Sequence, residues 1–404
     1  MNSGRTTSHL GEIISFERGL TYGKGDEVAF SSVGVLRSNN VDLATHSLNL
    51  EEIKFLRSDF QVPDKKKVKK SSLLMCMSNG SKDHLGKVAL IDRDLDYAFG
   101  GFMGLITPDE SKVLPKYLLY VLASKSFKDY IHNLADGANI NNLRFKDLAG
   151  FEIPLPSLPE QQHIVGVLDQ ERAKIDALKA KAEQSLQATK DLFQATLKME
   201  LAPKEGWHTT TIGALCDSVK YGTSKPSSLT GHFTYLRMNN ITNDGFLTLA
   251  DTKRIDITTK EEDKYLVRKG DILFNRTNSR ELVGKTCVFQ EEEPMVIAGY
   301  IIRLRVKNVV NPNFISYYIN HEPVRAELRK LSVGAVHQSN INAKTIQSFS
   351  ICLPKSIEEQ NHIVQVLSNI HDAVQQLQEN YQKTLAFCDD LKQALLRKAF
   401  NGEL

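Results

Sequence analysis

Long apolar runs, paired cysteines and a strong net charge are all missing from this sequence. No stretch of the 404 residues approaches 18 consecutive apolar residues, so we expect no transmembrane helix. The first nine residues carry no apolar core of a signal peptide, and a cytoplasmic protein is therefore predicted. Five cysteines lie far apart without a CxxC pair, which argues against a zinc site or a disulfide framework: Cys76, Cys216, Cys287, Cys352 and Cys388.

The net charge of +3 is small, but it is unevenly distributed along the chain. Residues 160–200 hold 6 lysines and arginines against 7 acidic residues, and residues 358–404 hold 4 against 7. The rest of the chain therefore carries a net charge of +7. A mild excess of this kind is compatible with a polyanionic partner without requiring one.

What the sequence does contain is an internal repeat. Seven short phrases return in the same order, at offsets of only 197 to 202 residues. Chance similarity would scatter the offsets, so we infer one ancestral unit that was duplicated and fused. The phrases begin at His9 and Thr211, Val35 and Tyr235, Leu85 and Val283, Pro115 and Pro312, Gly137 and Gly334, Ile153 and Ile351, and Glu160 and Glu359.

Each copy begins with a stretch of mixed strand and helix signals. β-Rich runs such as 87–91 and 286–289 are separated from their neighbours by turn clusters. Apolar helical patterns at 116–134 and 313–331 each follow a proline. These signals predict a mixed α/β domain in each copy.

Each copy ends with a periodic apolar stripe, and no glycine or proline interrupts 167–202 or 358–401. About 40 residues at 1.5 Å each would form a helix of roughly 60 Å, whose narrow stripe needs a partner helix. The alternative is that the stripes belong to the cores of the domains. We favour a pair of helices, one from each copy.

We therefore predict an α+β fold with two pseudo-symmetric mixed α/β domains, separated by two long antiparallel coiled-coil helices. The predicted domains are residues 1–153 and 204–352. The predicted helical spacers are 154–203 and 353–404.

Several near-motifs fail as catalytic sites. Residues 279–286 resemble a phosphate-binding loop, but serine replaces its first glycine and a strand-like run follows where a helix is needed. Residues 311–314 resemble the Asn-Pro-Pro-aromatic turn of amino-methyltransferases without the second proline. The histidines His163 and His362 have no metal-ligand spacing. We predict no catalytic residue, metal or cofactor in this chain.

Polar residues shared by the two copies are of a kind that suits nucleic acid. Arginine and asparagine contact guanine and adenine edges, and they also bind phosphate or cap turns. Because domains that read different sequences should differ at base-reading positions, we favour a structural role or phosphate contact for the shared residues. They are Arg37, Asn39 and Asn40 in the first copy and Arg237, Asn239 and Asn240 in the second.

Loops that differ between the copies are better candidates for base contacts, with solvated hairpins as the alternative. After a predicted strand, one loop offers Ser78, Asn79 and Lys82 in the first copy and Asn275, Arg276, Asn278 and Arg280 in the second. A later loop offers Asn141 and Arg144 in the first copy and His337, Gln338 and Asn340 in the second.

Two further features are candidates for contact with the DNA backbone. Tyr22 and Lys24 follow an early turn in the first copy, and Tyr221 and Lys225 follow the equivalent turn in the second. The strongest basic run, 64–70, contains Lys66 and Lys67. Phosphate binding by this run would be salt-sensitive, and a solvated loop is the alternative.

The whole chain resembles the specificity (S) subunits of type I restriction–modification systems. The phrases 151–165 and 349–364, which end the two predicted domains, carry the resemblance together with Gly270-Asp271-Ile272-Leu273-Phe274 and the Trp207…Ile212-Gly213 entry. The first domain departs from the pattern, with Ser71-Ser72-Leu73-Leu74 in place of the Gly-Asp-Ile-Leu phrase.

The resemblance implies a non-catalytic subunit in which two target recognition domains each read one half of a bipartite, asymmetric target in double-stranded DNA. The helices would set the unread gap and dock two modification subunits that methylate adenine, and restriction subunits would join them. The methyl donor, ATP and Mg would be bound by these partners, and no membrane would be involved.

Three alternatives remain at this point. The chain could serve a different methyltransferase or nuclease partner, or it could be a coiled-coil scaffold that does not bind DNA. An enzyme acting alone is disfavoured by the failed motifs.

Overall fold

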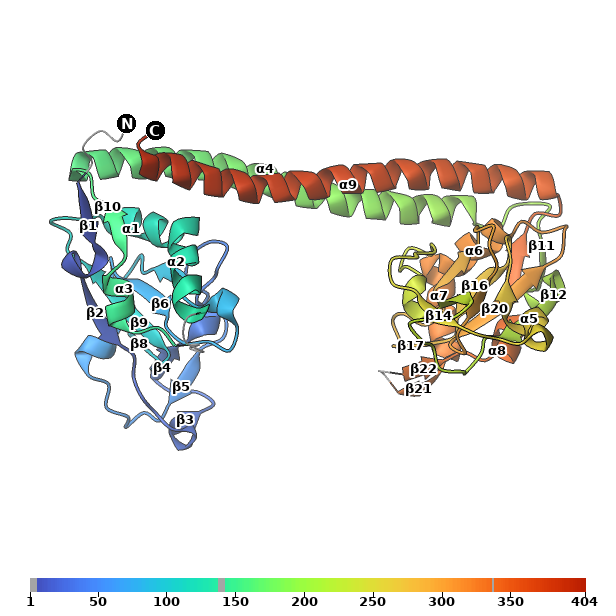
Figure 1. Ribbon diagram of the computed structural model, residues 1–404, viewed down its shortest axis with the longest axis horizontal. Coiled ribbons are helices and arrows are strands. Elements are labelled where there is room, and N and C mark those ends of the chain that lie inside the picture. The colour runs from blue at the N-terminus through green and yellow to red at the C-terminus, as the bar shows by residue number, and fades with distance from the viewer. Residues whose placement is uncertain (1–5, 137–141, 336–337) are drawn as a thin grey trace. The chain divides into compact units, whose positions relative to one another are not determined.

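The computed structural model describes residues 6–136, 142–335 and 338–404. The chain forms two compact units, of which unit 1 comprises residues 1–182 and 383–404 and unit 2 comprises residues 183–382. Each unit contains one globular copy of the repeat together with part of each long helix (Figure 1).

Unit 1 is built on two four-stranded sheets. The first is antiparallel and has the order β2-β9-β6-β7, and the second has the order β3-β5-β4-β8, with β4 and β8 parallel. The strands of the first sheet are β2 (Ile14–Arg18), β9 (Met103–Pro108), β6 (Leu73–Cys76) and β7 (Val88–Leu90). Those of the second are β3 (Glu27–Val28), β5 (Lys54–Leu56), β4 (Val33–Leu36) and β8 (Tyr97–Phe99). A separate pair joins the two ends of the globular part: β1 (Thr7–His9) and β10 (Glu152–Pro154).

Strand β6 contributes side chains to two cores, one on each face of its sheet. Leu73 and Met75 pack into a core shared with the helices, whereas Leu74 and Cys76 pack toward the second sheet. This division follows from the two-residue period of a strand, and burial on both faces explains its continuous apolar sequence. Figure 1 shows the resulting layers, with helices on one face of the sheet. The helices of the globular part are α1 (Pro115–Leu122), α2 (Lys125–Asp136) and α3 (Phe145–Ala149).

Unit 2 repeats this plan. Its antiparallel sheet has the order β12-β20-β16-β18 and its mixed sheet the order β14-β13-β19-β15. The strands are β12 (Cys216–Tyr221), β20 (Ile301–Val306), β16 (Ile272–Asn275), β18 (Thr286–Val288), β14 (Lys253–Ile255), β13 (Phe233–Leu236), β19 (Met295–Ile297) and β15 (Leu266–Val267). The end pair is β11 (His208–Thr211) with β23 (Ser350–Leu353), and a small sheet contains β17 (Thr277–Asn278), β22 (Gln338–Asn340) and β21 (Val333–Ala335). The helices are α5 (Thr259–Tyr265), α6 (Pro312–Asn320), α7 (Glu322–Leu331) and α8 (Ala343–Ser348).

The helical pattern expected after each proline is divided into two helices. In unit 2, His321 is extended between α6 and α7, and α7 starts with a proline in its first turn. In unit 1, Ser124 separates α1 from α2, and its hydroxyl bonds the carbonyl of Val121 and the N–H of Phe127. Proline is common in the first turn of a helix and serine at the N-cap position. The boundary between α6 and α7 and the boundary between α1 and α2 therefore both have local causes.

Two long helices complete the fold, α4 (Leu158–Glu200) and α9 (Ile357–Asn401), and they run antiparallel. In unit 1, Lys179 pairs with Asp389 at 2.8 Å and Asp176 pairs with Lys392. Residue numbers rise along one helix as they fall along the other, so the two helices are antiparallel. Together with the two mixed α/β domains, this pair confirms the predicted fold class. Within the described part of the chain, no helix combines the length and the apolar character needed to cross a membrane.

Candidate nucleic-acid interface

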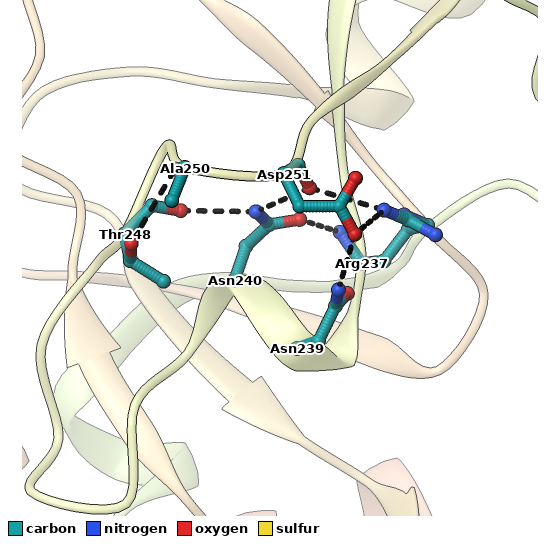
Figure 2. A network of polar contacts seen from close by, with 6 residues as sticks. All are labelled: Arg237, Asn239, Asn240, Thr248, Ala250 and Asp251. Carbon is teal, nitrogen blue, oxygen red and sulfur yellow. Dashed lines mark hydrogen bonds and ion pairs between the residues drawn. The ribbon is translucent and has the colours of Figure 1, made fainter. Parts of the chain in front are cut away.

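The shared Arg-x-Asn-Asn phrase forms a tight turn after β13 in unit 2. The Oδ1 of Asn240 accepts a hydrogen bond from the backbone N–H of Arg237 at 2.8 Å. Its Nδ2 donates to the carbonyls of Thr248 and Asp251, at 2.9 and 3.1 Å. Figure 2 shows Asn240 at the centre of these contacts. Because Asn240 is only 1% exposed and its amide is fully used, it stabilises the turn and does not face a ligand.

Arg237 and Asn239 lie beside the same turn and share one carboxylate. Nη2 of Arg237 and Nδ2 of Asn239 both donate to Oδ2 of Asp251, at 2.8 and 3.1 Å (Figure 2). This carboxylate partly neutralises Arg237 and fixes the direction of its guanidinium.

Unit 1 builds the same turn around Asn40, which is also 1% exposed. Its Oδ1 accepts from the N–H of Arg37 at 2.8 Å, and its Nδ2 donates to the carbonyls of Asn49 and Glu52. Asn39 donates to the same Glu52 carbonyl at 3.2 Å. The Glu52 carboxylate lies 3.8 Å from Arg37, so this arginine is held more loosely than Arg237.

A groove of about 990 Å³ opens beside this turn in unit 1. Five residues predicted from the sequence line it together: Tyr22, Lys24, Arg37, Asn39 and Ser78. Its lining also contains residues that were not predicted from the sequence, above all Arg18 and Phe102. Three cations against two carboxylates leave the lining mildly basic, as expected of a surface that contacts phosphate.

Close backbone crossings fix the ends of β2 and β12. Gly19 follows β2 and lies against the carbonyl of Gly100, while Gly222 follows β12 and lies against the carbonyl of Ala298. At either glycine a Cβ atom would overlap that carbonyl, so only glycine fits. The N–H groups of both glycines bond the strand opposite, which identifies the two crossings as equivalent.

Because the two crossings are equivalent, they show which of the predicted backbone-contacting residues near them occupy the same place in the two units. Arg18 lies opposite Gly104 in β9, and Tyr221 lies opposite Ile302 in β20, so Tyr221 matches Arg18. By the same count, Tyr22 matches Lys225. The cause is a bulge near the start of β12, which inserts one residue between Cys216 and Ser218.

In unit 2 the candidates gather around Arg276. Its guanidinium lies over the ring of Tyr221 at 5.0 Å, and its Nη2 donates to Oδ1 of Asn340 at 2.9 Å. Its Nη1 donates to the carbonyl of Gly299 at 3.2 Å. The hydroxyl of Tyr221 in turn accepts from the N–H of Ala343 at 2.7 Å. These contacts preorganise Arg276, which lowers the entropic cost of binding.

The predicted lysines of the basic run are held in ion pairs. Lys66 is 2.5 Å from Glu17 Oε1 and also donates to the carbonyl of Arg18. Lys67 pairs with Asp96 at 2.6 Å. Lys66 therefore stabilises the end of β2, next to the groove.

The remaining candidates lie in several places. Arg144 caps α3 and forms a two-bonded pair with Asp147, which lowers the pKa of that carboxyl. Asn275 is fully buried, while Arg280 and Lys82 are exposed. Other described candidates are Asn79, which donates to Ser38 Oγ at 3.3 Å, Asn278, which lies in β17, and Gln338, which lies in β22. Asn141 and His337 lie outside the described residues.

Lys225 is paired rather than free. Its Nζ lies 2.7 Å from Oε2 of Glu261 at the start of α5. This ammonium, together with the N–H and hydroxyl of Thr258, lowers the pKa of Glu261 to about 2. A phosphate that contacted Lys225 would therefore compete with a carboxylate.

Among the described residues, the metal-ligating and nucleophilic side chains are the ones that bear on catalysis. None of their His, Cys, Asp or Glu side chains form a group of three that could hold a metal ion. Burial raises the pKa of Cys216 to about 11 and that of Cys287 to about 12, so both thiols stay protonated near neutral pH. A protonated thiol is a poor nucleophile.

Comparison with known proteins identifies the family. The family described as "Type I restriction modification DNA specificity domain" matches residues 3–188 and again residues 204–385. The chain belongs to this family of specificity subunits. Both matches fall on the repeat inferred from the sequence, so each globular copy is one specificity domain.

Individual relatives agree along nearly the whole chain. The type I restriction enzyme StySPI specificity subunit of Salmonella potsdam is 29% identical, over 99% of this chain and 89% of its own length. The EcoKI specificity subunit of Escherichia coli strain K12 is 26% identical over the same shares. A chain from a solved type I R-M system is 20% identical and has a TM-score of 0.79, covering 99% of this chain and 98% of that chain. The last likeness supports the fold.

Proposed function

We propose that each specificity domain of this subunit reads one half of a bipartite, asymmetric target in double-stranded DNA. The observation that carries the proposal is a repeated backbone with different side chains at the site. Arg18 in unit 1 takes the place of Tyr221 in unit 2, and Tyr22 takes the place of Lys225. Domains that differ in this way should select different bases, which makes the whole target asymmetric.

The long helices would set the unread gap and dock two modification subunits. Four leucines support the docking: Leu178 and Leu391 in unit 1, which are 45% and 37% exposed, and Leu377 and Leu192 in unit 2, at 41% and 54%. The second pair is the repeat counterpart of the first. Two equivalent pairs of exposed leucines on the helices suit two copies of one partner.

The chain itself would be non-catalytic. The protonated thiols Cys216 and Cys287 are consistent with this role. Methyl transfer to adenine, ATP hydrolysis and Mg binding would then belong to the modification and restriction subunits, in the cytoplasm.

Adenine methylation mapped across the genome tests the proposal. Long-read sequencing of the host and of a strain lacking this gene should show the loss of one split, asymmetric adenine motif. Exchanging residues 1–153 for the equivalent domain of a relative should then change one half of that motif only. A change in both halves would contradict the division of reading between the units. An unchanged methylome, with no sequence-selective DNA binding by the assembled complex, would favour a scaffold that does not read DNA.

A further inference from the structure

Both units expose a large aromatic side chain at the same turn. Phe102, between β8 and β9, is 70% exposed, and Tyr300, between β19 and β20, is 51% exposed. The two turns are equivalent because each precedes the strand that pairs with the first strand of its sheet. Single exposed rings such as Phe30 are common on protein surfaces, so the significant feature is that both units expose a ring at the same turn, beside the candidate interface.

The backbone of each turn is held in place. The carbonyl of Phe102 accepts hydrogen bonds from the N–H groups of Met77 and Ser78, at 2.8 and 3.2 Å. The carbonyl of Tyr300 accepts from the N–H of Arg276 at 2.9 Å. The glycine crossings lie next to these turns, since Gly19 packs against the carbonyl of Gly100 and Gly222 against that of Ala298. Each ring therefore projects from a fixed point, and only two side-chain torsions must be ordered on binding.

An arginine lies beside each turn. Arg18 Nε donates to the carbonyl of Gly101 at 3.4 Å, and Arg276 Nη1 donates to the carbonyl of Gly299 at 3.2 Å. One arginine comes from a strand and the other from a loop, yet both contact the glycine that precedes the exposed ring. In unit 1 the ring also lines the groove that contains Arg37 and Asn39.

We propose that Phe102 and Tyr300 are specificity-determining residues, and that each ring packs against the C5-methyl group of a thymine in the half-target of its own unit. The inference rests on the proposed function. The thymine methyl is the main apolar feature that base edges present in the major groove. A ring with an arginine beside its turn matches it, because the arginine can contact a phosphate or a neighbouring base while the ring covers the methyl.

The test removes the methyl group and the ring separately. The full chain is assembled with its modification subunits, and its Kd is measured on duplexes that carry the mapped target. Each thymine of each half-target is replaced in turn by uracil, which lacks only the methyl. The variants are Phe102→Ala and Tyr300→Ala, each of which is the control for the other half-target. Phe30→Ala is a further control, since Phe30 is 81% exposed in unit 1 and lies outside the groove lining.

We expect one uracil in the unit 1 half-target to weaken binding of the unchanged complex about fourfold, the effect of one buried methyl. Phe102→Ala should weaken binding by at least as much and should abolish the response to that uracil. Tyr300→Ala should do the same in the other half-target only, and Phe30→Ala should change neither.

Three outcomes overturn the proposal. Binding of Phe102→Ala or Tyr300→Ala as tight as that of the unchanged complex would exclude the contact. Weaker binding that still responds to every uracil would exclude the methyl as its partner. If the unchanged complex shows no sequence preference at all, the proposed function itself fails, and this result is distinct from the first two.

Discussion

The two units attach the same globular fold to the same helix pair with different chemistry. In unit 2, His371 of α9 stacks on Phe246 with ring centroids 3.9 Å apart, and it packs edge-on against Phe193 of α4. In unit 1 the repeat counterpart of His371 is Arg172, which lies over the ring of Tyr120 at 5.3 Å. A cavity of about 550 Å³ opens beside Arg172.

A buried glutamine is common to both units at the point where the globular copy meets its long helix. Gln161 accepts a hydrogen bond from the N–H of Leu114 at 2.8 Å, and Gln360 accepts one from the N–H of Asn311 at 2.9 Å. Each glutamine also donates to a proline carbonyl in the segment before its long helix. The two copies have thus kept these contacts to the backbone, while the side-chain packing around them has diverged.

The largest effect should come from the shared contact, and it should be large in both units. Replacing Gln161 or Gln360 with leucine keeps the volume but leaves buried backbone groups without partners, which should cost about 3 kcal/mol of unfolding free energy. Chemical denaturation, with hydrogen exchange to locate the loss, measures it. Gln162→Leu, on the exposed face of α4, is the control. A large cost in one unit alone would show that the glutamines are not equivalent.

Mutations in the side-chain packing near the glutamines should instead have different effects in the two units. His371 is 8% exposed, so His371→Ala should leave a cavity and cost about 2 to 3 kcal/mol. Arg172→Ala, its matched counterpart, removes a half-exposed contact with one ring and should cost less than about 1 kcal/mol. Thermal unfolding of the two variants compares them directly. Equal losses of unfolding free energy would mean that the packing around Arg172 in unit 1 is as tight as the packing around His371 in unit 2.

Acid should weaken unit 1 through a residue that unit 2 lacks. His46 has a positive φ of 56°, at the position where the repeat has Gly245 with a φ of 85°. Burial lowers the pKa of His46 from 6.5 to about 4. The unfolded chain therefore binds the proton more tightly than the folded chain does.

Because the folded chain binds the His46 proton more weakly, unit 1 should lose stability as the pH falls. The stabilisation is present above pH 6.5 and should be lost as the pH falls toward 4, by roughly 2 kcal/mol after allowance for partial exposure. His46→Gly, which copies unit 2, should remove this pH dependence. Hydrogen exchange of unit 1 at pH 7 and pH 4.5, corrected for intrinsic rates, measures it. If the slope persists in the glycine variant, another group is responsible.

The smallest effect concerns a second cavity, of about 210 Å³, which is lined by Lys128 in unit 1. The counterpart of Lys128 is Arg325, which donates to the carbonyls of Asn243 and Glu281 at 3.4 and 3.2 Å. Lys128→Arg should therefore stabilise unit 1 by up to about 1 kcal/mol, and Arg325→Lys should destabilise unit 2 by a similar amount. Thermal unfolding of the two reciprocal variants is the measurement. Destabilisation by Lys128→Arg would show that the cavity cannot accept the longer group.

Sequence alone predicted most of the architecture, and particular elements show why. The uninterrupted apolar stripes predicted α4 and α9, because helical periodicity and the absence of proline are local properties. The break between α6 and α7 was missed, although the proline at position 323 was its local signal. At the site, five candidates met in one groove, whereas the exposed ring of Phe102 left no pattern in the sequence.

The duplication, the mixed α/β domains, the long helices and the family could all be inferred from the sequence. Which side chains face the groove depends on how the chain folds in three dimensions. For Asn40 and Asn240 the sequence left a structural role and phosphate contact open, and their burial shows that they hold a turn. The match of Tyr221 with Arg18 depends on a bulge and on strand pairing across more than 80 residues. One inserted residue shifts every later side chain in a strand, and distant pairing partners, which no local pattern reveals, fix where that shift occurs.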